Sequence, residues 1–176
     1  MIEEINLSNI KDINNSNQPF DVIGKIIPAF KDDIWTFTEF LYDKPYEKYY
    51  PNDDEDNYED YINNPDKIIY FYYDNNNECI GQIKISKYWN KYAFIEDIAV
   101  SKNSRGKKIG TQLINKAIEW AKQKNLCGLM LETQDNNLNA CRFYNKLGFK
   151  IGAVDIMLYA NFENAYEKAV FWYIKF

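Results

Sequence analysis

The sequence predicts an α+β protein in which a mixed sheet carries helices on its faces. The 176 residues suffice for one domain with a real core, so we expect a single domain over 1–176. Hydrophobic residues make up 46% of the chain and charged residues 27%, which is a globular composition. The expected segments run mostly as strands first and then as strand–helix–strand–helix–strand–strand, an order typical of mixed sheets flanked by helices.

The first half of the chain is expected to hold two strands, at 20–30 and 34–43, joined by the turn 31–33. Apolar side chains occur on both faces of the second strand, which predicts burial on both sides. The acidic segment 51–65 follows, where we expect a short helix that ends at Asn63–Pro65. Its carboxylates form either a solvated face or a rim that attracts cations.

The second half alternates strands with two amphipathic helices. Within 101–125 the apolar residues recur at helical spacing, and Asn125 is a suitable left-handed cap. In the second helix, 136–148, Gly148 is a natural stop. The expected strands are 67–74 and 79–86, which form a hairpin, and then 92–100, 126–133, 149–161 and 168–176.

Charge and composition bear on the class of partner. The net charge of −5 disfavours a nucleic-acid partner, which usually needs a basic face. The same charge suits a small cationic ligand, although it is also common in ordinary proteins. Since no apolar run reaches the ~18 residues of a membrane span, we expect no membrane partner. Because residues 1–15 are polar and acidic, we expect no signal peptide in this segment.

The absence of histidine limits the chemistry that the chain can perform. A histidine-based triad and a histidine metal site are both excluded. Acid–base work therefore falls to carboxylates, tyrosine, lysine, cysteine or water. Cys79, Cys127 and Cys141 lack metal-ligand spacing, which indicates reduced thiols in the cytoplasm and no metal cofactor.

Residues 98–111 combine a strand end, a loop and a helix start. The free N–H groups and the dipole of a helix N-terminus bind anions, above all phosphates. Gly106 and Gly110 would let a ligand approach the backbone, while Arg105, Lys107 and Lys108 add positive charge. We expect Lys108 to keep a helical backbone. The segment matches neither a P-loop nor a G-x-G-x-x-G fingerprint, and it could instead be a basic loop that caps a helix.

Two linked motifs resemble the GNAT acetyltransferase superfamily over roughly residues 65–160. "RGKKIG" follows "IEDIAV" and is similar to the family's cofactor loop, with Lys108 where a glycine is expected. The second motif, Asn-x-x-Ala-x-x-Phe-Tyr-x-x-x-Gly-Phe, is matched without a gap by Asn137, Ala140, Phe143, Tyr144, Gly148 and Phe149. The resemblance implies a GNAT fold, with a mostly antiparallel twisted sheet that splays at the cofactor site.

A closer resemblance extends over nearly the whole chain. "PFDVIGKIIP", "WTFTE", "GLMLETQDNN" and "MLYANFEN…EKAVFWY" are similar to segments of the streptothricin acetyltransferases, an antibiotic-resistance branch. This implies acetyl transfer from acetyl-CoA to an amine of the β-lysine arm of streptothricin. Two alternatives stay open: a protein N-terminal or lysine acetyltransferase, and a CoA-binding module without catalysis. Aromatic residues near the C-terminus would also support a homodimer.

The resemblance assigns cofactor contacts to the loop, the strand before it and the second motif. The CoA pyrophosphate would lie on the N–H groups of about Lys108–Thr111. Unpaired backbone groups at the strand end would bond pantetheine, and one N–H there would polarise the thioester carbonyl. Asn137 would bond pantetheine or cap its helix. The expected cofactor residues are Ile98, Ala99, Val100, Arg105, Gly106, Lys107, Lys108, Ile109, Gly110, Thr111, Asn137 and Tyr144.

Tyr144 is the candidate general acid for the departing thiolate, because its ordinary pKa of about 10 keeps it protonated. The alternative is a core aromatic. Direct proton transfer from a lysine-like amine to a glutamate is uphill by about 6 pKa units, or about 8 kcal/mol. The base therefore needs a raised pKa, a substrate amine with a lowered pKa, or a water relay, and we prefer the water relay. Glu96 is the preferred base, and Asp97 is expected on the opposite face. Both Glu96 and Asp97 are also candidates for binding the substrate, and the alternative for each is a structural carboxylate. Glu39 and the acidic stretch 53–60 are further candidates for binding the cationic substrate.

Overall fold

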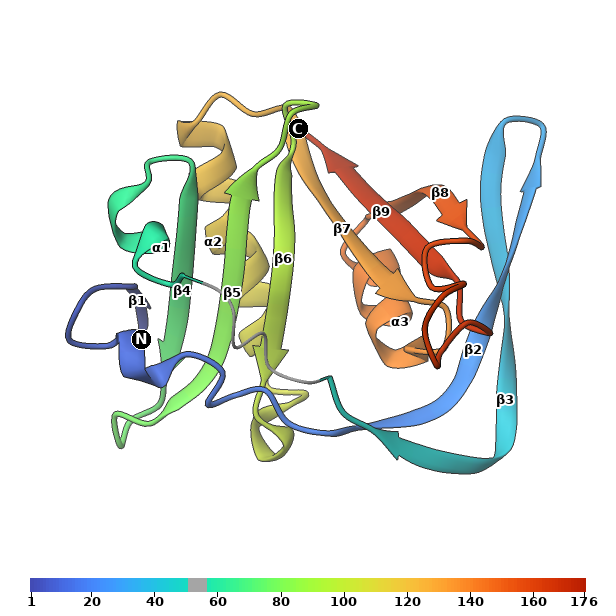
Figure 1. Ribbon diagram of the computed structural model, residues 1–176, viewed down its shortest axis with the longest axis horizontal. Helices are drawn as coiled ribbons and strands as arrows, with labels where there is room; N and C mark the ends of the chain where they lie inside the picture. Colours follow the sequence, from blue (N-terminus) through green and yellow to red (C-terminus); the bar gives the residue numbers. More distant parts are fainter. Residues whose placement is uncertain (51–56) are drawn as a thin grey trace. The chain divides into compact units, whose positions relative to one another are not determined.

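Two units, each assembled from two separate stretches of chain, make up the computed structural model, which describes residues 1–50 and 57–176. Unit 1 comprises Met1–Phe20 and Tyr49–Leu129, and unit 2 comprises Asp21–Lys48 and Met130–Phe176 (Figure 1). The expectation of one domain over the whole chain stays a prediction.

Unit 1 contains a sheet with the strand order β1-β4-β5-β6, in which each neighbouring pair is antiparallel. The hairpin of β4 (Lys67–Tyr73) and β5 (Cys79–Lys87) is confirmed, as is β6 (Ala93–Val100). Sequence patterning missed β1 (Ile2–Glu4), since three residues are too few to show alternation.

Helix α2 (Ile109–Gln123) covers one face of this sheet, behind β4 and β5 in Figure 1. Its apolar stripe packs closely on β5, where a Cβ at Gly81 would lie 3.1 Å from Ile109 Cγ2. The predicted left-handed cap is confirmed, because Asn125 has φ 55°. The buried residues of the helix are Ile109, Leu113, Ile114, Ala117, Trp120 and Ala121.

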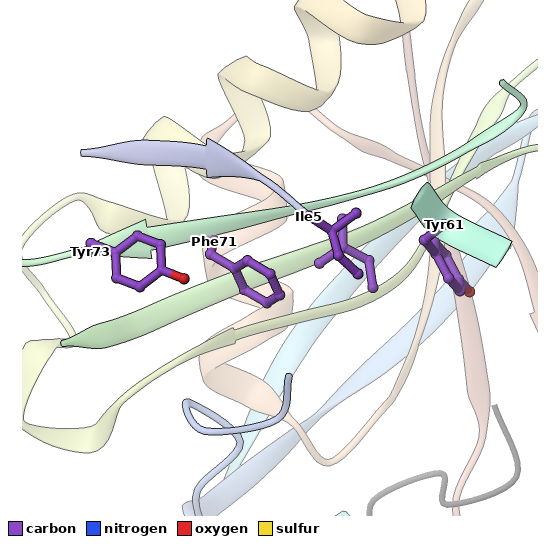
Figure 2. Close-up of a cluster of buried hydrophobic side chains, with 5 residues drawn as sticks. Ile5, Tyr61, Phe71 and Tyr73 are labelled. Atoms are coloured by element: carbon purple, nitrogen blue, oxygen red, sulfur yellow. The ribbon is translucent and has the colours of Figure 1, made fainter. Parts of the chain in front are cut away.

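A second cluster of side chains packs around β4 and α1 (Asp60–Asn63) (Figure 2). It consists of Ile5, Tyr61, Ile69, Phe71 and Tyr73. A short helix ending at Asn63 was predicted for the acidic segment, and α1 confirms that part. Residues 51–56 of the segment lie outside the described residues. Short 3₁₀ turns occupy Ile10–Asp12 and Lys102–Ser104.

Unit 2 contains a long two-stranded hairpin of β2 (Phe20–Lys31) and β3 (Ile34–Lys48). Its turn residues Asp32 and Asp33 have φ 50° and 60°, a conformation that suits the right-handed twist of hairpins. Burial of β3 on both sides was predicted and is wrong, because most of its side chains are exposed. Within unit 2, Phe37 meets the Trp172 ring edge-on at 6.0 Å.

The remaining strands of unit 2 follow the order β7-β9-β8, and β8 pairs antiparallel with β9. The predicted strand 149–161 is too long, because β8 covers only Lys150–Asp155. Asp155 Oδ1 accepts the N–H groups of Met157 (2.7 Å) and Leu158 (3.1 Å), which turns the chain out of the strand. The other elements are β7 (Gly128–Gln134), α3 (Leu138–Lys146) and β9 (Ala169–Lys175).

The fold class is confirmed as mixed α/β, with mostly antiparallel strands flanked by helices. The expected splay concerns β6 and β7, whose residues fall mainly in different units, and it stays a prediction. Across the described ranges, each helix is too short or too polar to cross a membrane.

Candidate active site

The N-terminus of α2 is open in unit 1. Lys108 occupies the cap position, and within the described chain no side chain caps the helix. The first intrahelical bond runs from the Gln112 N–H to the Lys108 carbonyl at 3.1 Å. The N–H groups of Ile109, Gly110 and Thr111 precede that bond and form the donor set expected for a phosphate.

Lys108 itself corrects one expectation. A helical backbone was predicted here, but Lys108 has φ 64° and ψ 13°, in the left-handed region. That conformation costs a non-glycine residue about 1–2 kcal/mol. A glycine at this place in the motif would avoid this cost, so lysine is accommodated with strain.

Arg105 ties the loop to the N-terminal segment of unit 1. Its Nε donates to the Val100 carbonyl at 2.9 Å, and its two Nη atoms donate to the carbonyls of Pro19 (2.9 Å) and Gln18 (3.0 Å). Gly106 adopts φ 79°, with open space where a Cβ would lie. Lys107 and Lys108, the two lysines expected near the phosphate, are both exposed. Arg105 therefore has a structural role in shaping the loop.

The other predicted cofactor residues divide between backbone and core. Ile109 is only 4% exposed and packs on β5, so its side chain belongs to the core. At the end of β6, Ile98, Ala99 and Val100 pair with β5 in regular register. Any contact from Ile109 to a cofactor would use its backbone N–H.

The register of β5 and β6 contains a β-bulge at Glu96. Lys84 pairs with Asp97 while Ile85 pairs with Ile95, so Glu96 has no partner on β5. A bulge places one extra residue in the strand and breaks the alternation of faces. Opposite faces were predicted for Glu96 and Asp97, and that prediction is wrong: both carboxylates reach the face opposite α2.

The partners of the two carboxylates support this arrangement. The Tyr61 hydroxyl donates to Glu96 Oε2, and Gln82 Nε2 donates to Asp97 Oδ2 at 2.6 Å. Gln82 is itself held by the N–H of Asn14, which donates to Gln82 Oε1 at 2.7 Å. Burial raises the pKa of the Asp97 carboxyl; the Gln82 hydrogen bond and the Lys84 ammonium oppose that shift, and the Glu96 charge reinforces it.

Tyr144 lies on α3 in unit 2 and is 6% exposed. Its ring packs against Phe149 at 5.6 Å and Trp172 at 6.4 Å between centroids. Tyr144 is therefore a core aromatic residue, as the alternative predicted. Its role as general acid, which would depend on the hydroxyl group alone, stays a prediction.

Asn137 caps α3, since its Oδ1 accepts the Ala140 N–H at 3.2 Å. The capping alternative is thus confirmed, and a bond to pantetheine stays a prediction. Glu39, predicted to bind substrate, forms a two-bond ion pair with Arg142 at 2.9 and 2.5 Å. The Arg142 hydrogen bond holds the pKa of Glu39 below its usual value. Glu39 would have to leave this pair before it could bind a cationic substrate.

Comparison with known proteins decides the family. The sequence pattern of the Acetyltransferase (GNAT) family matches residues 34–149. The chain belongs to the GNAT acetyltransferase family. It is 54% identical over 176 residues to "Streptothricin acetyltransferase A" of Bacillus subtilis (strain 168), covering 100% of both chains. It is also 41% identical over 97 residues to the streptothricin acetyltransferase of Escherichia coli, covering 54% of this chain and 56% of that protein.

Solved structures agree with this GNAT assignment. A Bacillus anthracis (strain Ames) protein assigned as a streptothricin acetyltransferase, in complex with acetyl coenzyme A, has a TM-score of 0.89 and 36% identity. The match covers 100% of this chain and 97% of that one. Nourseothricin acetyltransferase, at 23% identity and TM-score 0.83 over 99% and 97% of the two chains, supports the fold. As a GNAT enzyme, the protein is an acetyl-CoA-dependent N-acetyltransferase.

Sequence reasoning missed Glu132 of this acetyltransferase. Glu132 lies on β7, half-buried, and its Oε1 accepts the Tyr159 hydroxyl at 2.7 Å. Gln134 Nε2 in turn donates to the Tyr159 oxygen at 2.9 Å. Burial raises the pKa of the Glu132 carboxyl, while the Tyr159 hydrogen bond lowers it. The available signal was an acidic residue in an otherwise apolar buried strand.

Glu167 was missed as well, because it lies in a polar loop before β9. It is 2% exposed and accepts both contacts of the Lys48 ammonium, at 2.5 and 2.6 Å. Asn136 Nδ2 donates to it at 2.8 Å. Among residues 1–50 and 57–176, no group of three or more histidine, cysteine or acidic side chains could hold a metal ion.

Proposed function

We propose that this GNAT enzyme transfers the acetyl group of acetyl-CoA to a primary amine of the β-lysine moiety of streptothricin, and thereby confers resistance to it. One observation carries the proposal: the full-length match at 54% identity to a streptothricin acetyltransferase, which includes both cofactor motifs. The family match at 34–149 takes in residues of both units, which supports treating 1–176 as one catalytic domain.

The donor, acetyl-CoA, is proposed to bind at the open end of α2. The N–H groups of Ile109, Gly110 and Thr111 would hold its pyrophosphate, with Lys107 and Lys108 adding charge. The helix start fits an anion, because Lys108 at the cap position makes no side-chain bond to these donors. An N–H near Ala99 or Val100 would polarise the thioester carbonyl and stabilise the oxyanion of the tetrahedral intermediate.

The acceptor amine has to lose a proton before it attacks the thioester. Glu96 is proposed as the base, acting through a water molecule. Because net transfer from an ordinary amine to a glutamate is uphill by about 8 kcal/mol, the bound substrate amine would also need a lowered pKa. The bulge supports a shared role for Glu96 and Asp97, since it brings both carboxylates to one face. Glu96 would take the proton, and Asp97 would help to orient the cationic substrate.

Collapse of the intermediate breaks the C–S bond and releases the CoA thiolate. Tyr144 is proposed to donate its hydroxyl proton to that thiolate, so that free CoA leaves as a thiol. Its packed ring supports the assignment because Phe149 and Trp172 restrict the ring to one orientation.

The proposal also covers substrate attraction, dimer formation and cellular location. Glu39 and the acidic residues of 53–60 would attract the other positive charges of the substrate, although 53–56 lie outside the described residues. Exposed aromatic residues such as Phe162, Tyr166 and Phe176 would support a homodimer. The three cysteines, none of which forms a disulfide, are consistent with the expected cytoplasmic location.

Acetyl-CoA-dependent thiol release tests the substrate. We expect turnover with streptothricin and little with peptides that begin with alanine or serine. Equal or faster turnover on the peptides would favour a protein N-terminal acetyltransferase instead. No thiol release with either class of acceptor, together with tight acetyl-CoA binding, would favour a binding module.

Expression in a susceptible bacterium tests the resistance role. We expect the minimum inhibitory concentration of streptothricin to rise in cells that express the chain, compared with cells that carry the Tyr144→Phe variant. An unchanged inhibitory concentration would refute the resistance role while leaving the chemistry open to the enzyme assay.

A further inference from the structure

Lys84 is an unusually buried lysine beside the carboxylates of unit 1. It is 7% exposed, in the central strand β5, although lysine is among the residues least often buried. Its cross-strand partner is Asp97. Its ammonium lies 5.3 Å from the centroid of the Tyr58 ring and 5.8 Å from that of Tyr61. Both distances are within the range of cation–π attraction.

The same contacts link Lys84 to both carboxylates of the bulge. Side chains of directly paired strand residues share a face, so the Lys84 ammonium and the Asp97 carboxylate lie on the same side of the sheet. Tyr61, whose ring lies under the ammonium, donates its hydroxyl to Glu96. Lys84 is therefore the cross-strand partner of Asp97, and the Tyr61 ring lies between its ammonium and Glu96.

We propose that Lys84 is a positioning residue for acetyl transfer: its ammonium offsets the negative charge that Glu96 and Asp97 place on one face of the sheet, so that both side chains keep the arrangement in which Glu96 acts as the base. The inference rests on the proposed function of Glu96 as the base. Two adjacent carboxylates on one face repel each other, and a nearby cation offsets that repulsion.

The electrostatics of Asp97 agree with this geometry. Burial raises the pKa of Asp97, and the Glu96 charge adds to the rise, while Lys84 lowers it. A second lysine, Lys67, lies 5.2 Å from the centroid of the Tyr61 ring and 3.5 Å from Asp60. Asp12 accepts the Tyr73 hydroxyl at the other end of the cluster.

The pH dependence of kcat/KM for acetyl transfer tests the proposal. In Lys84→Met, we expect the acidic limb of the profile to move to higher pH by about 1 unit, as removal of a nearby opposite charge does. The rate at pH values below the limb should then fall about tenfold, while the rate on the plateau above it should stay within about threefold of the wild-type rate. Lys84→Arg retains the charge and should keep the limb at its original pH.

Lys67→Met is the matched control, because Lys67 lies near the same Tyr61 ring but is paired with Asp60 at the surface. We expect its pH profile to match the wild type. A folded Lys84→Met variant, shown by its circular dichroism spectrum, with an unmoved acidic limb would overturn the proposal. If Lys84→Met does not fold, Lys84→Gln makes the same charge change with a polar side chain and is judged by the same criterion.

Glu96→Gln distinguishes the role of Glu96 as the base from the positioning role of Lys84. An inactive Glu96→Gln combined with an unmoved limb in the Lys84 variants refutes the role of Lys84 alone. A fully active Glu96→Gln refutes Glu96 as the base and, with it, the role of Lys84. An inactive Glu96→Gln combined with the shifted limb supports both.

Discussion

The two helices that follow β6 and β7 begin in opposite ways. At α3, Asn137 accepts the Ala140 N–H and satisfies one of the free donors of the first turn. At α2, the cap position holds Lys108, whose side chain makes no capping bond. The cap residue of α2 thus leaves the donors of its first turn open to a ligand or water, whereas the cap residue of α3 satisfies one of its own.

This difference separates two ways in which a helix can serve an active site. An uncapped helix offers its backbone, so what matters at α2 is that a ligand can approach the first turn. A capped helix offers its side chains, so what matters at α3 is that Tyr144 keeps its orientation. The following predictions test this distinction.

The largest effect is expected from Gly110→Leu at the start of α2. Leucine is a good helix former, so the helix should persist, but its side chain would block the approach of a phosphate to the free N–H groups. We expect the Kd for acetyl-CoA to rise at least about 100-fold, equivalent to about 3 kcal/mol. Isothermal titration calorimetry measures it directly.

Asn115→Leu is the control for this variant, because Asn115 is exposed on the same helix one turn further on. It should bind acetyl-CoA like the wild type. Wild-type affinity in Gly110→Leu itself would show that the backbone of this first turn does not hold the cofactor.

Tyr144→Phe tests whether α3 acts through a side chain. The ring contacts with Phe149 and Trp172 are kept and only the hydroxyl is lost. We expect kcat to fall about 100-fold, as is typical for the loss of a general acid, while the Kd for acetyl-CoA stays nearly unchanged. Steady-state kinetics and calorimetry on the same preparation separate the two quantities.

A silent Tyr144→Phe variant would contradict this role and reduce Tyr144 to a core aromatic. Its melting temperature provides the control, since a stability loss would mean that the hydroxyl has a structural partner. Unchanged stability with reduced kcat is the expected combination.

Periodicity predicted most of the fold, because its signals lie in single elements. The stripe of α2 and the β4–β5 hairpin follow directly from the spacing of apolar residues. The solvent exposure of β3 could not be read in this way, because aromatic residues on both faces suggest burial whether or not a partner covers them. The early end of β8 depends on two hydrogen bonds of one aspartate, for which strand patterning carries no signal.

The candidate site was predicted less completely, for a related reason. The motif located Asn137 and Tyr144, but their roles depend on partners distant in sequence. The bulge at Glu96 depends on how β5 and β6 pair, and its only mark in the sequence is a shift of the alternation between Ile95, which pairs with Ile85, and Ile98, which pairs with Ile83. The left-handed backbone of Lys108 was missed for a different reason: non-glycine residues rarely adopt positive φ, so a lysine predicts an ordinary backbone.

Asn137→Ala removes the cap that distinguishes α3 from α2. We expect the free energy of unfolding to fall by about 1 kcal/mol, the usual value of such a cap, as measured by denaturant titration. Asn137→Asp retains the accepting oxygen and should restore the stability. A large loss of acetyl-CoA affinity in Asn137→Asp, without loss of stability, would instead support a bond from the Asn137 amide to pantetheine.

The smallest effect is expected from Lys108→Gly, where the observed backbone reverses the expected sign of the stability change. With a helical backbone, Lys108→Gly would cost stability through glycine's entropy. With the observed φ of 64°, glycine relieves about 1–2 kcal/mol of strain against about 0.5–1 kcal/mol of entropy, so we expect the variant to be about 0.5–1 kcal/mol more stable. The Kd for acetyl-CoA should stay within about tenfold, because the backbone donors remain. A larger loss of affinity would show that the Lys108 ammonium itself binds the pyrophosphate, and that α2, like α3, also acts through a side chain.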